Sequence, residues 1–214
     1  MNNGNNIGSD VFIKICGITR ADEAKAIADL GVDAIGMILH AKSPRLISLR
    51  TAQSIRKVVP ENVKLVGVVV NASQQTIEDL VDQIQLDMVQ LHGDETPDFA
   101  DQLLVPYIKA LRPRSKAQAL NEAAAFSNAQ AILLDPYVKD QYGGTGHTLD
   151  TDLWPQGALK PLILAGGLDA DNVVQKVREL SPYGVDMNSG LELRAGRKNL
   201  PEVARAVKQL RALK

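Results

Sequence analysis

The chain has 214 residues, of which 45% are hydrophobic and 23% are charged, and its formal net charge at pH 7 is −1. This composition excludes a disordered or fibrous protein, and the near-neutral charge lacks the one-sided field that recruits nucleic acid or an anionic membrane. Because the single cysteine cannot close an intramolecular disulfide, nothing points to an oxidising compartment, and we expect a cytoplasmic protein.

The opening ten residues, MNNGNNIGSD, have neither the basic nor the apolar region of a signal peptide, and we predict that residues 1–10 form a disordered tail. No stretch approaches the roughly 18 consecutive apolar residues that a membrane span needs. Residues 11–214 are enough to bury one large core, so we expect a single domain.

The first strand pattern covers residues 12–16 and ends at the only cysteine. Thr19, followed three residues later by Asp22, resembles a capping box that starts a helix, and Gly31 ends that helix. The chain therefore begins with a strand that leads through a short turn into a helix.

Apolar segments of this kind, rich in Val, Ile and Leu without strict alternation, recur along the chain. The predicted strands cover residues 12–16, 34–39, 64–70, 87–91, 106–110, 131–135, 161–165 and 184–187. Amphipathic helical patterns separate them, one after a Ser73 cap, one after Asp169 and a last one over residues 203–210. The weakest covers residues 148–154, where barely two turns precede Pro155.

Near-continuous apolar strands separated by amphipathic helices are typical of parallel strands covered by helices. Eight such units predict an α/β fold of the (β/α)₈ TIM-barrel type, close to the short limit of roughly 200 residues for that fold. The main alternative is an open doubly wound sheet, which places its ligand at one switch point. Here polar and glycine-rich residues follow almost every strand, which favours the barrel.

Functional residues of such a barrel lie at the carboxyl ends of the strands, and Cys16 stands at the end of the first. A cysteine in an apolar strand is usually a small hydrophobic residue. Gly17 changes that expectation because it permits a tight turn and the close approach of a ligand. Cys16 is therefore a candidate functional residue.

Asp135 closes a strand of four apolar residues, where a carboxylate is costly to bury unless it has a partner or a task. The alternative is that its side chain caps the following loop. That loop continues into GGTG at residues 143–146, which includes Gly144 and could close over a substrate. The stretch lacks the lysine of a P-loop and the third glycine of a dinucleotide fingerprint.

Gly166 and Gly167 follow the seventh strand, and Ser189 and Gly190 follow the eighth. Glycines in these places leave backbone N–H groups near helix starts, where the helix dipole favours an anion. Barrels often bind phosphate after strands seven and eight, so we predict a phosphate site there. The alternative is that these glycines only form tight turns.

Arg45, in the sequence SPR after the second strand, can form a bidentate pair with a carboxylate or a phosphate, or can be a solvated surface residue. His92 either faces the barrel mouth or supports its own loop. His40, His92 and His147 fall in different loops without metal-ligand spacing, so we expect no metal site.

These motifs, taken in order, resemble phosphoribosylanthranilate isomerase of the tryptophan pathway. The resemblance spans the chain from about Phe12 to Lys198, and KICGIT together with GGTG is its most specific part. It rests on KICGIT at residues 14–19, SPR at 43–45, VQLHGDE at 89–95, LLD at 133–135, GGTG at 143–146, AGGL at 165–168 and NSGLE at 188–192.

The resemblance implies a metal-free barrel without a cofactor that converts N-(5′-phosphoribosyl)anthranilate to 1-(2-carboxyphenylamino)-1-deoxyribulose 5-phosphate by an Amadori rearrangement. It implies that Cys16 is the general base, that Asp135 is the general acid and that Arg45 binds the anthranilate carboxylate. The phosphate would be held by Gly166, Gly167, Ser189 and Gly190, and we count His92 and Gly144 among the substrate-binding residues as well.

Two other functions account for part of the same sequence pattern. The related sugar-phosphate isomerase of histidine biosynthesis has an aspartate at the position of Cys16 and a second phosphate site after strand three, which residues 70–73 lack. A catalytically silent barrel that binds a phosphorylated metabolite needs neither Cys16 nor Asp135. We expect a small phosphorylated substrate as ligand, neither nucleic acid nor membrane as partner, and a monomer or a homodimer.

Overall fold

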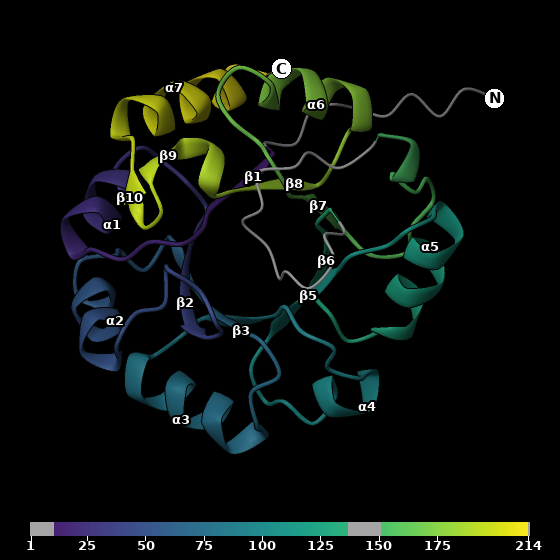
Figure 1. The fold of residues 1–214 in the computed structure, drawn as a ribbon, viewed down its shortest axis with the longest axis horizontal. Helices are drawn as coiled ribbons and strands as arrows, with labels where there is room; N and C mark the ends of the chain where they lie inside the picture. The colour runs from purple at the N-terminus through teal and green to yellow at the C-terminus, as the bar shows by residue number, and fades with distance from the viewer. Residues whose placement is uncertain (1–10, 137–150, 214) are drawn as a thin grey trace.

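The computed structural model describes residues 11–136 and 151–213, so the predicted tail and the GGTG stretch with Gly144 lie outside the described residues. Eight parallel strands close into a barrel in chain order, as Figure 1 shows from one end. The strands are β1 (Phe12–Ile15), β2 (Ala34–His40), β3 (Lys64–Val69), β4 (Met88–Leu91), β5 (Tyr107–Leu111), β6 (Ala131–Leu134), β7 (Leu162–Leu164) and β8 (Gly184–Met187).

The barrel is closed by the pairing of β1 with β8, in which Lys14 lies opposite Asp186. This pairing excludes the open doubly wound sheet, because such a sheet leaves its two edge strands unpaired. The predicted single-domain (β/α)₈ barrel is confirmed, and each strand lies within two residues of its predicted bounds.

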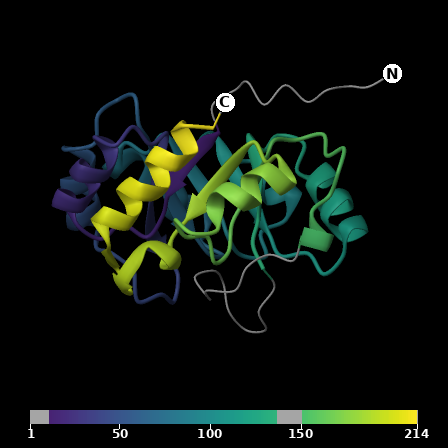
Figure 2. The ribbon, with the colours of Figure 1, turned by 90° about the horizontal axis from the view of Figure 1, so that it is seen from above.

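Helices surround the barrel in Figure 1 and run alongside the strands in Figure 2. The α-helices are α1 (Ala21–Ala28), α2 (Leu49–Arg56), α3 (Gln74–Ile84), α4 (Pro97–Ala100), α5 (Lys116–Ala125), α6 (Val173–Leu180) and α7 (Leu200–Arg211). Within the described part of the chain, the weak helical pattern before Pro155 forms only the 3-10 turn η1 (Thr151–Leu153).

Between β8 and α7 the chain adds a second 3-10 turn and a small hairpin. The turn is η2 (Ser189–Leu191), and the hairpin pairs β9 (Glu192–Arg194) with β10 (Arg197–Lys198). Figure 2 shows this hairpin at the end of the barrel opposite the chain's C-terminus. It therefore lies where the strands end and the functional loops begin.

The two helix starts predicted from side-chain caps had different outcomes. Ser73 caps α3 as predicted, and its hydroxyl accepts a hydrogen bond from the Thr76 amide at 3.2 Å. The capping box at Thr19 is wrong, because α1 begins after Arg20 without a side-chain cap. The Thr19 hydroxyl instead donates to the Gly196 carbonyl at 2.6 Å, so a tertiary partner replaces the local one.

The barrel interior has an apolar side and a polar side. Alternate residues of β5 to β7 point inward and form a buried apolar cluster of Ile108, Ala110, Ala131, Leu133, Ile163 and Ala165. In contrast, β1, β4 and β8 contribute Lys14, Gln90 and Asp186, all of them buried. The polar side lies directly below the strand ends that carry the predicted functional residues.

Candidate active site

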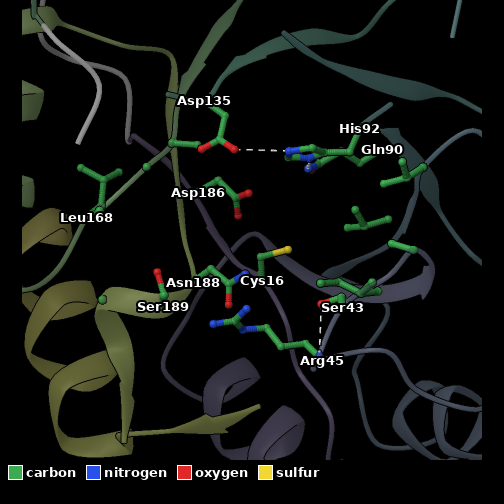
Figure 3. Close-up of a pocket in the computed structure, with 18 residues that line it drawn as sticks. Cys16, Ser43, Arg45, Gln90, His92, Asp135, Leu168, Asp186, Asn188 and Ser189 are labelled. Atoms are coloured by element: carbon green, nitrogen blue, oxygen red, sulfur yellow. Dashed lines mark hydrogen bonds and ion pairs between the residues drawn. The ribbon is translucent and has the colours of Figure 1, made fainter. Parts of the chain in front are cut away.

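A pocket of about 710 Å³, including the space open to solvent, lies at the carboxyl ends of the strands. Figure 3 shows side chains from widely separated segments converging on it. All predicted site residues within the described part of the chain line it, namely Cys16, Arg45, His92, Asp135, Gly166, Gly167, Ser189 and Gly190. Closure of the barrel thus brings together residues that lie up to 174 positions apart in the sequence.

Cys16 follows β1 directly, and its amide donates to the Met187 carbonyl at 2.9 Å. Gly17 has a φ of +74°, and a Cβ there would collide with the Asn188 side chain, so a glycine is required after the cysteine. Gly36 of β2 leaves room for the sulfur, since a Cβ at that position would lie 2.6 Å from Sγ. The thiol therefore packs against the backbone of Gly36.

Lys14 lies two residues before Cys16 and so points to the same side of β1. Its Nζ forms an ion pair with Asp186 of β8 at 2.9 Å, and the lysine is fully buried. Burial opposes the charge of Lys14, but the carboxylate of Asp186 and the neighbouring Cys16 raise its pKa above 10.5. The lysine is thus a permanent cation beside the thiol.

The pKa of Cys16 is raised above its ordinary value of 9.0, mainly because burial disfavours the thiolate. The ammonium of Lys14 opposes this by lowering the pKa, and the carboxylate of Asp186 raises it. Cys16 is therefore a thiol at neutral pH, placed next to the one kind of group that can stabilise its ionised form.

Asp135 comes directly after β6 and is 5% exposed. Its carboxyl Oδ2 lies 3.3 Å from Nε2 of His92, and Figure 3 shows the other oxygen turned away from that ring. The carboxyl faces the pocket from a different side than Cys16.

His92 lies between two polar partners. Its Nδ1 is 2.8 Å from the side-chain amide nitrogen of Gln90, Nε2, and its own Nε2 is 3.3 Å from Asp135 Oδ2. The ring therefore faces the barrel mouth, which agrees with the first of the two predicted alternatives.

The loop that carries His92 is supported by other residues. The Lys109 ammonium donates to the Gly93 carbonyl and to Glu95 Oε2, both at 2.7 Å. Glu95 in turn accepts from the amides of Gly93 and Asn71, at 2.9 and 2.8 Å. This buried ion pair joins the loop after β4 to β3 and β5 and fixes its shape.

Arg45 is 8% exposed and is therefore not the solvated surface residue of the alternative prediction. Its Nε and Nη2 donate to Glu192 at 3.0 and 2.8 Å, and Lys198 Nζ approaches the same carboxylate at 3.1 Å. Burial alone would raise the pKa of Glu192, but the hydrogen bonds from Arg45 and the charge of Lys198 lower it. Two cations around one carboxylate leave a net positive region at this edge of the pocket.

The loops after β7 and β8 touch each other. Gly166 and Gly167 have φ values of +93° and +54°, and a Cβ at Gly190 would collide with the Leu168 carbonyl. Only glycine permits this close approach, so the two predicted phosphate loops form one wall of the pocket.

Several pocket residues were not predicted from the sequence. Gln90, Asp186 and Asn188 line the pocket, and Lys14, Glu192 and Lys198 form hydrogen bonds with residues that line it. Lys14, Gln90 and Asn188 lie within the quoted motifs KICGIT, VQLHGDE and NSGLE. Asp186 lies two residues before the last of these motifs, so all four had a usable signal in the sequence. Glu192 and Lys198 lie on the hairpin, and no local pattern connected them to Arg45.

Within residues 11–136 and 151–213, no three His, Cys, Asp or Glu side chains are placed to hold a metal ion. The helices of the same residues are all too short or too polar to cross a membrane.

A closed barrel with a thiol, a carboxyl and a cationic cluster in one pocket at its strand ends defines a (β/α)₈-barrel enzyme. Residues 13–209 match the family model described as N-(5′-phosphoribosyl)anthranilate (PRA) isomerase. A curated N-(5′-phosphoribosyl)anthranilate isomerase from Pseudomonas fluorescens is 46% identical over 191 residues, which are 89% of this chain and 91% of that protein.

Solved structures agree with the sequence comparison. Phosphoribosyl anthranilate isomerase from Thermotoga maritima is 32% identical with a TM-score of 0.86, covering 95% of this chain and 100% of that one. A phosphoribosyl anthranilate isomerase in complex with reduced 1-(o-carboxyphenylamino)-1-deoxyribulose 5-phosphate is 30% identical with a TM-score of 0.83 and the same coverage. The chain belongs to the PRA isomerase family and is an isomerase.

Proposed function

We propose that the protein converts N-(5′-phosphoribosyl)anthranilate to 1-(2-carboxyphenylamino)-1-deoxyribulose 5-phosphate, with Cys16 as general base and Asp135 as general acid. The observation that carries this proposal is that the thiol after β1 and the carboxyl after β6 line the same pocket. Membership of the PRA isomerase family supports the choice of substrate.

The reaction begins with a proton transfer from Asp135 to the furanose ring oxygen. The anilino nitrogen supplies the electron pair that opens the ring, and an iminium forms at C1′. Cys16, as thiolate, then removes the proton from C2′ and leaves an enolamine. Protonation at C1′ and loss of the C2′ hydroxyl proton give the ketone, so substrate and product are isomers.

The thiolate is needed only at the second step, and the adjacent ammonium of Lys14 stabilises it. Asp186 holds Lys14 in place through the 2.9 Å ion pair. Since the pKa of Cys16 is raised by burial, the thiolate is a minor species at neutral pH. It is also the more reactive base for that reason, because a conjugate base strengthens as the pKa of its acid rises.

The substrate's two anionic ends are each assigned to a set of pocket residues. Arg45 binds the anthranilate carboxylate in the net positive region that it forms with Lys198 and Glu192. The phosphate is held in the wall formed by the touching loops, through Gly166, Gly167, Ser189 and Gly190. His92 contributes to substrate binding from the side of β4, and Gly144 belongs to the same proposal from outside the described residues.

The domain boundaries belong to this proposal as well. The catalytic domain begins at residue 11 after a short tail, and the enzyme works in the cytoplasm as a monomer or a homodimer.

An anthranilate-fluorescence assay with freshly generated phosphoribosylanthranilate tests the activity. The substrate's fluorescence decays when the wild-type protein is added, and it persists when Cys16→Ala is added instead. Arg205→Ala, which removes only exposed ion pairs on α7, is the folded control and keeps the activity. Absence of turnover by the wild-type protein contradicts the proposed function.

A further inference from the structure

Gln90 of β4 is a buried polar side chain with an aliphatic residue on each neighbouring strand. It is 1% exposed, and its neighbours in register are Val68 of β3 and Ile108 of β5. It lies two residues before His92, so both side chains point into the barrel, and both line the pocket. A buried amide between two aliphatic residues needs a physical reason.

The side-chain hydrogen bond of Gln90 determines which ring nitrogen of His92 carries the proton. With the amide in this orientation, Nε2 of Gln90 donates to Nδ1 of His92 over 2.8 Å, which makes Nδ1 the unprotonated acceptor. The single ring proton then sits on Nε2, which lies 3.3 Å from Oδ2 of Asp135. Glutamine, histidine and aspartate thus form a directed chain of hydrogen bonds.

The same amide leaves a buried atom without a partner. Among the described residues, nothing donates a hydrogen bond to Oε1 of Gln90. An unsatisfied buried oxygen destabilises the folded state, whereas a methionine of similar length would fill the space without that cost. Stability therefore does not explain the glutamine, and its contact with His92 does.

The geometry points to Gln90 as a positioning residue that holds His92 as the neutral tautomer with its proton on Nε2, and through it orients Asp135. This inference rests on the proposed role of Asp135 as the acid. The proton from His92 occupies Oδ2, so the acidic proton of Asp135 sits on the other oxygen, which Figure 3 shows turned away from the ring. Because the neutral ring carries no formal charge, it directs the carboxyl without forcing it to ionise.

The tautomer can be measured directly in the intact protein. Long-range ¹H–¹⁵N correlation spectra of the ¹⁵N-labelled chain at pH 8 distinguish a protonated Nδ1 from a protonated Nε2, and His92→Asn identifies the signals of His92. We expect a protonated Nε2 in the wild type. Gln90→Glu places an acceptor beside Nδ1 and moves the proton there, while Gln130→Glu, an exposed control, changes nothing.

Kinetics and thermal unfolding separate positioning from packing. Gln90→Glu lowers kcat about tenfold or more, with KM within about twofold, because the hydrogen bond that His92 Nε2 donates to the acid is lost. Gln90→Met lowers kcat similarly while its Tm equals or exceeds that of the wild type. A wild-type His92 protonated on Nδ1, or a Gln90→Met variant with a much lower Tm and normal kcat, overturns the inference. Failure of the wild type to turn over substrate overturns only the proposed function, because the tautomer is read without substrate.

Discussion

The two sides of the pocket differ in the charge of the group that lies beside the proposed catalytic residue. On the thiol wall, formed by Lys14, Cys16 and Asp186, a full positive charge stands beside the proposed base. On the acid wall, formed by Gln90, His92 and Asp135, the partner of the proposed acid is an imidazole whose other ring nitrogen contacts the side-chain amide of Gln90. A nearby cation helps a base that must become an anion, but the same cation would favour ionisation of an acid that must keep its proton, so a neutral partner suits the acid better than a charged one.

The largest loss of activity is expected from the variant that removes the acidic proton from the acid wall. Asp135→Asn keeps the shape of the side chain and an oxygen that accepts from His92, but it cannot protonate the ring oxygen. We expect kcat to fall by about 10²- to 10⁴-fold with little change in KM, measured by steady-state fluorescence kinetics. Near-normal turnover by this variant would remove Asp135 from the mechanism.

The next largest effect is expected when Lys14→Met removes the cation from the thiol wall. The Lys14 charge lowers the pKa of Cys16, so Lys14→Met raises that pKa further and shifts the thiolate to higher pH. We expect alkylation by iodoacetamide at pH 8, and kcat/KM at the same pH, to be roughly tenfold slower per pKa unit gained. Because the chain has one cysteine, the label reports Cys16 alone.

Lys14→Met leaves Asp186 buried without its partner, which costs about 3–5 kcal/mol and can prevent folding. The double variant Lys14→Met/Asp186→Asn has no unpaired charge and serves as the second measurement. It still alkylates more slowly than the wild type, because Lys14 has a larger effect on the pKa of Cys16 than Asp186 has. An unchanged rate in both variants would show that the thiol wall does not stabilise the thiolate.

The smallest effect concerns neither wall but the net positive region. Arg45→Lys keeps a positive charge and loses the two-pronged geometry, so we expect KM to rise about tenfold with kcat nearly unchanged. Arg205→Lys, at an exposed ion pair with Asp171, is the matched control and leaves KM as it is. A loss of kcat at constant KM would argue that Arg45 does not hold the substrate carboxylate.

Whether a cap predicted from the sequence is present depends on how far along the chain the bonding partner of its side chain lies. The cap predicted at Ser73 is present, and its partner, the Thr76 amide, lies three residues further along the chain. Thr19 and Asp22 have the same spacing, but the hydroxyl of Thr19 found a partner 177 residues away on the hairpin. Local spacing predicts a local bond only where no tertiary partner competes for the same atom.

The candidate site follows the same rule. Cys16, Asp135 and the paired glycines could be found because each terminates an apolar strand, and strand ends of a parallel barrel meet on one face. Lys14 and Asp186 form a pair across 172 residues, and their function depends on which strands adjoin in the closed barrel. The buried pairing of Arg45 with Glu192 likewise depends on a hairpin that folds back over the pocket.

The sequence by itself determined the rhythm of strands and helices, the barrel and the chemical types at the strand ends. These depend on the period of apolar residues and on the conformations that glycine permits, both of which neighbouring residues impose. Only the tertiary structure decided which charges meet, which tautomer His92 adopts and which atoms face the pocket. Those properties arise from contacts between distant segments in a low-dielectric interior, where a shift of about one ångström or of one proton changes the electrostatic energy strongly.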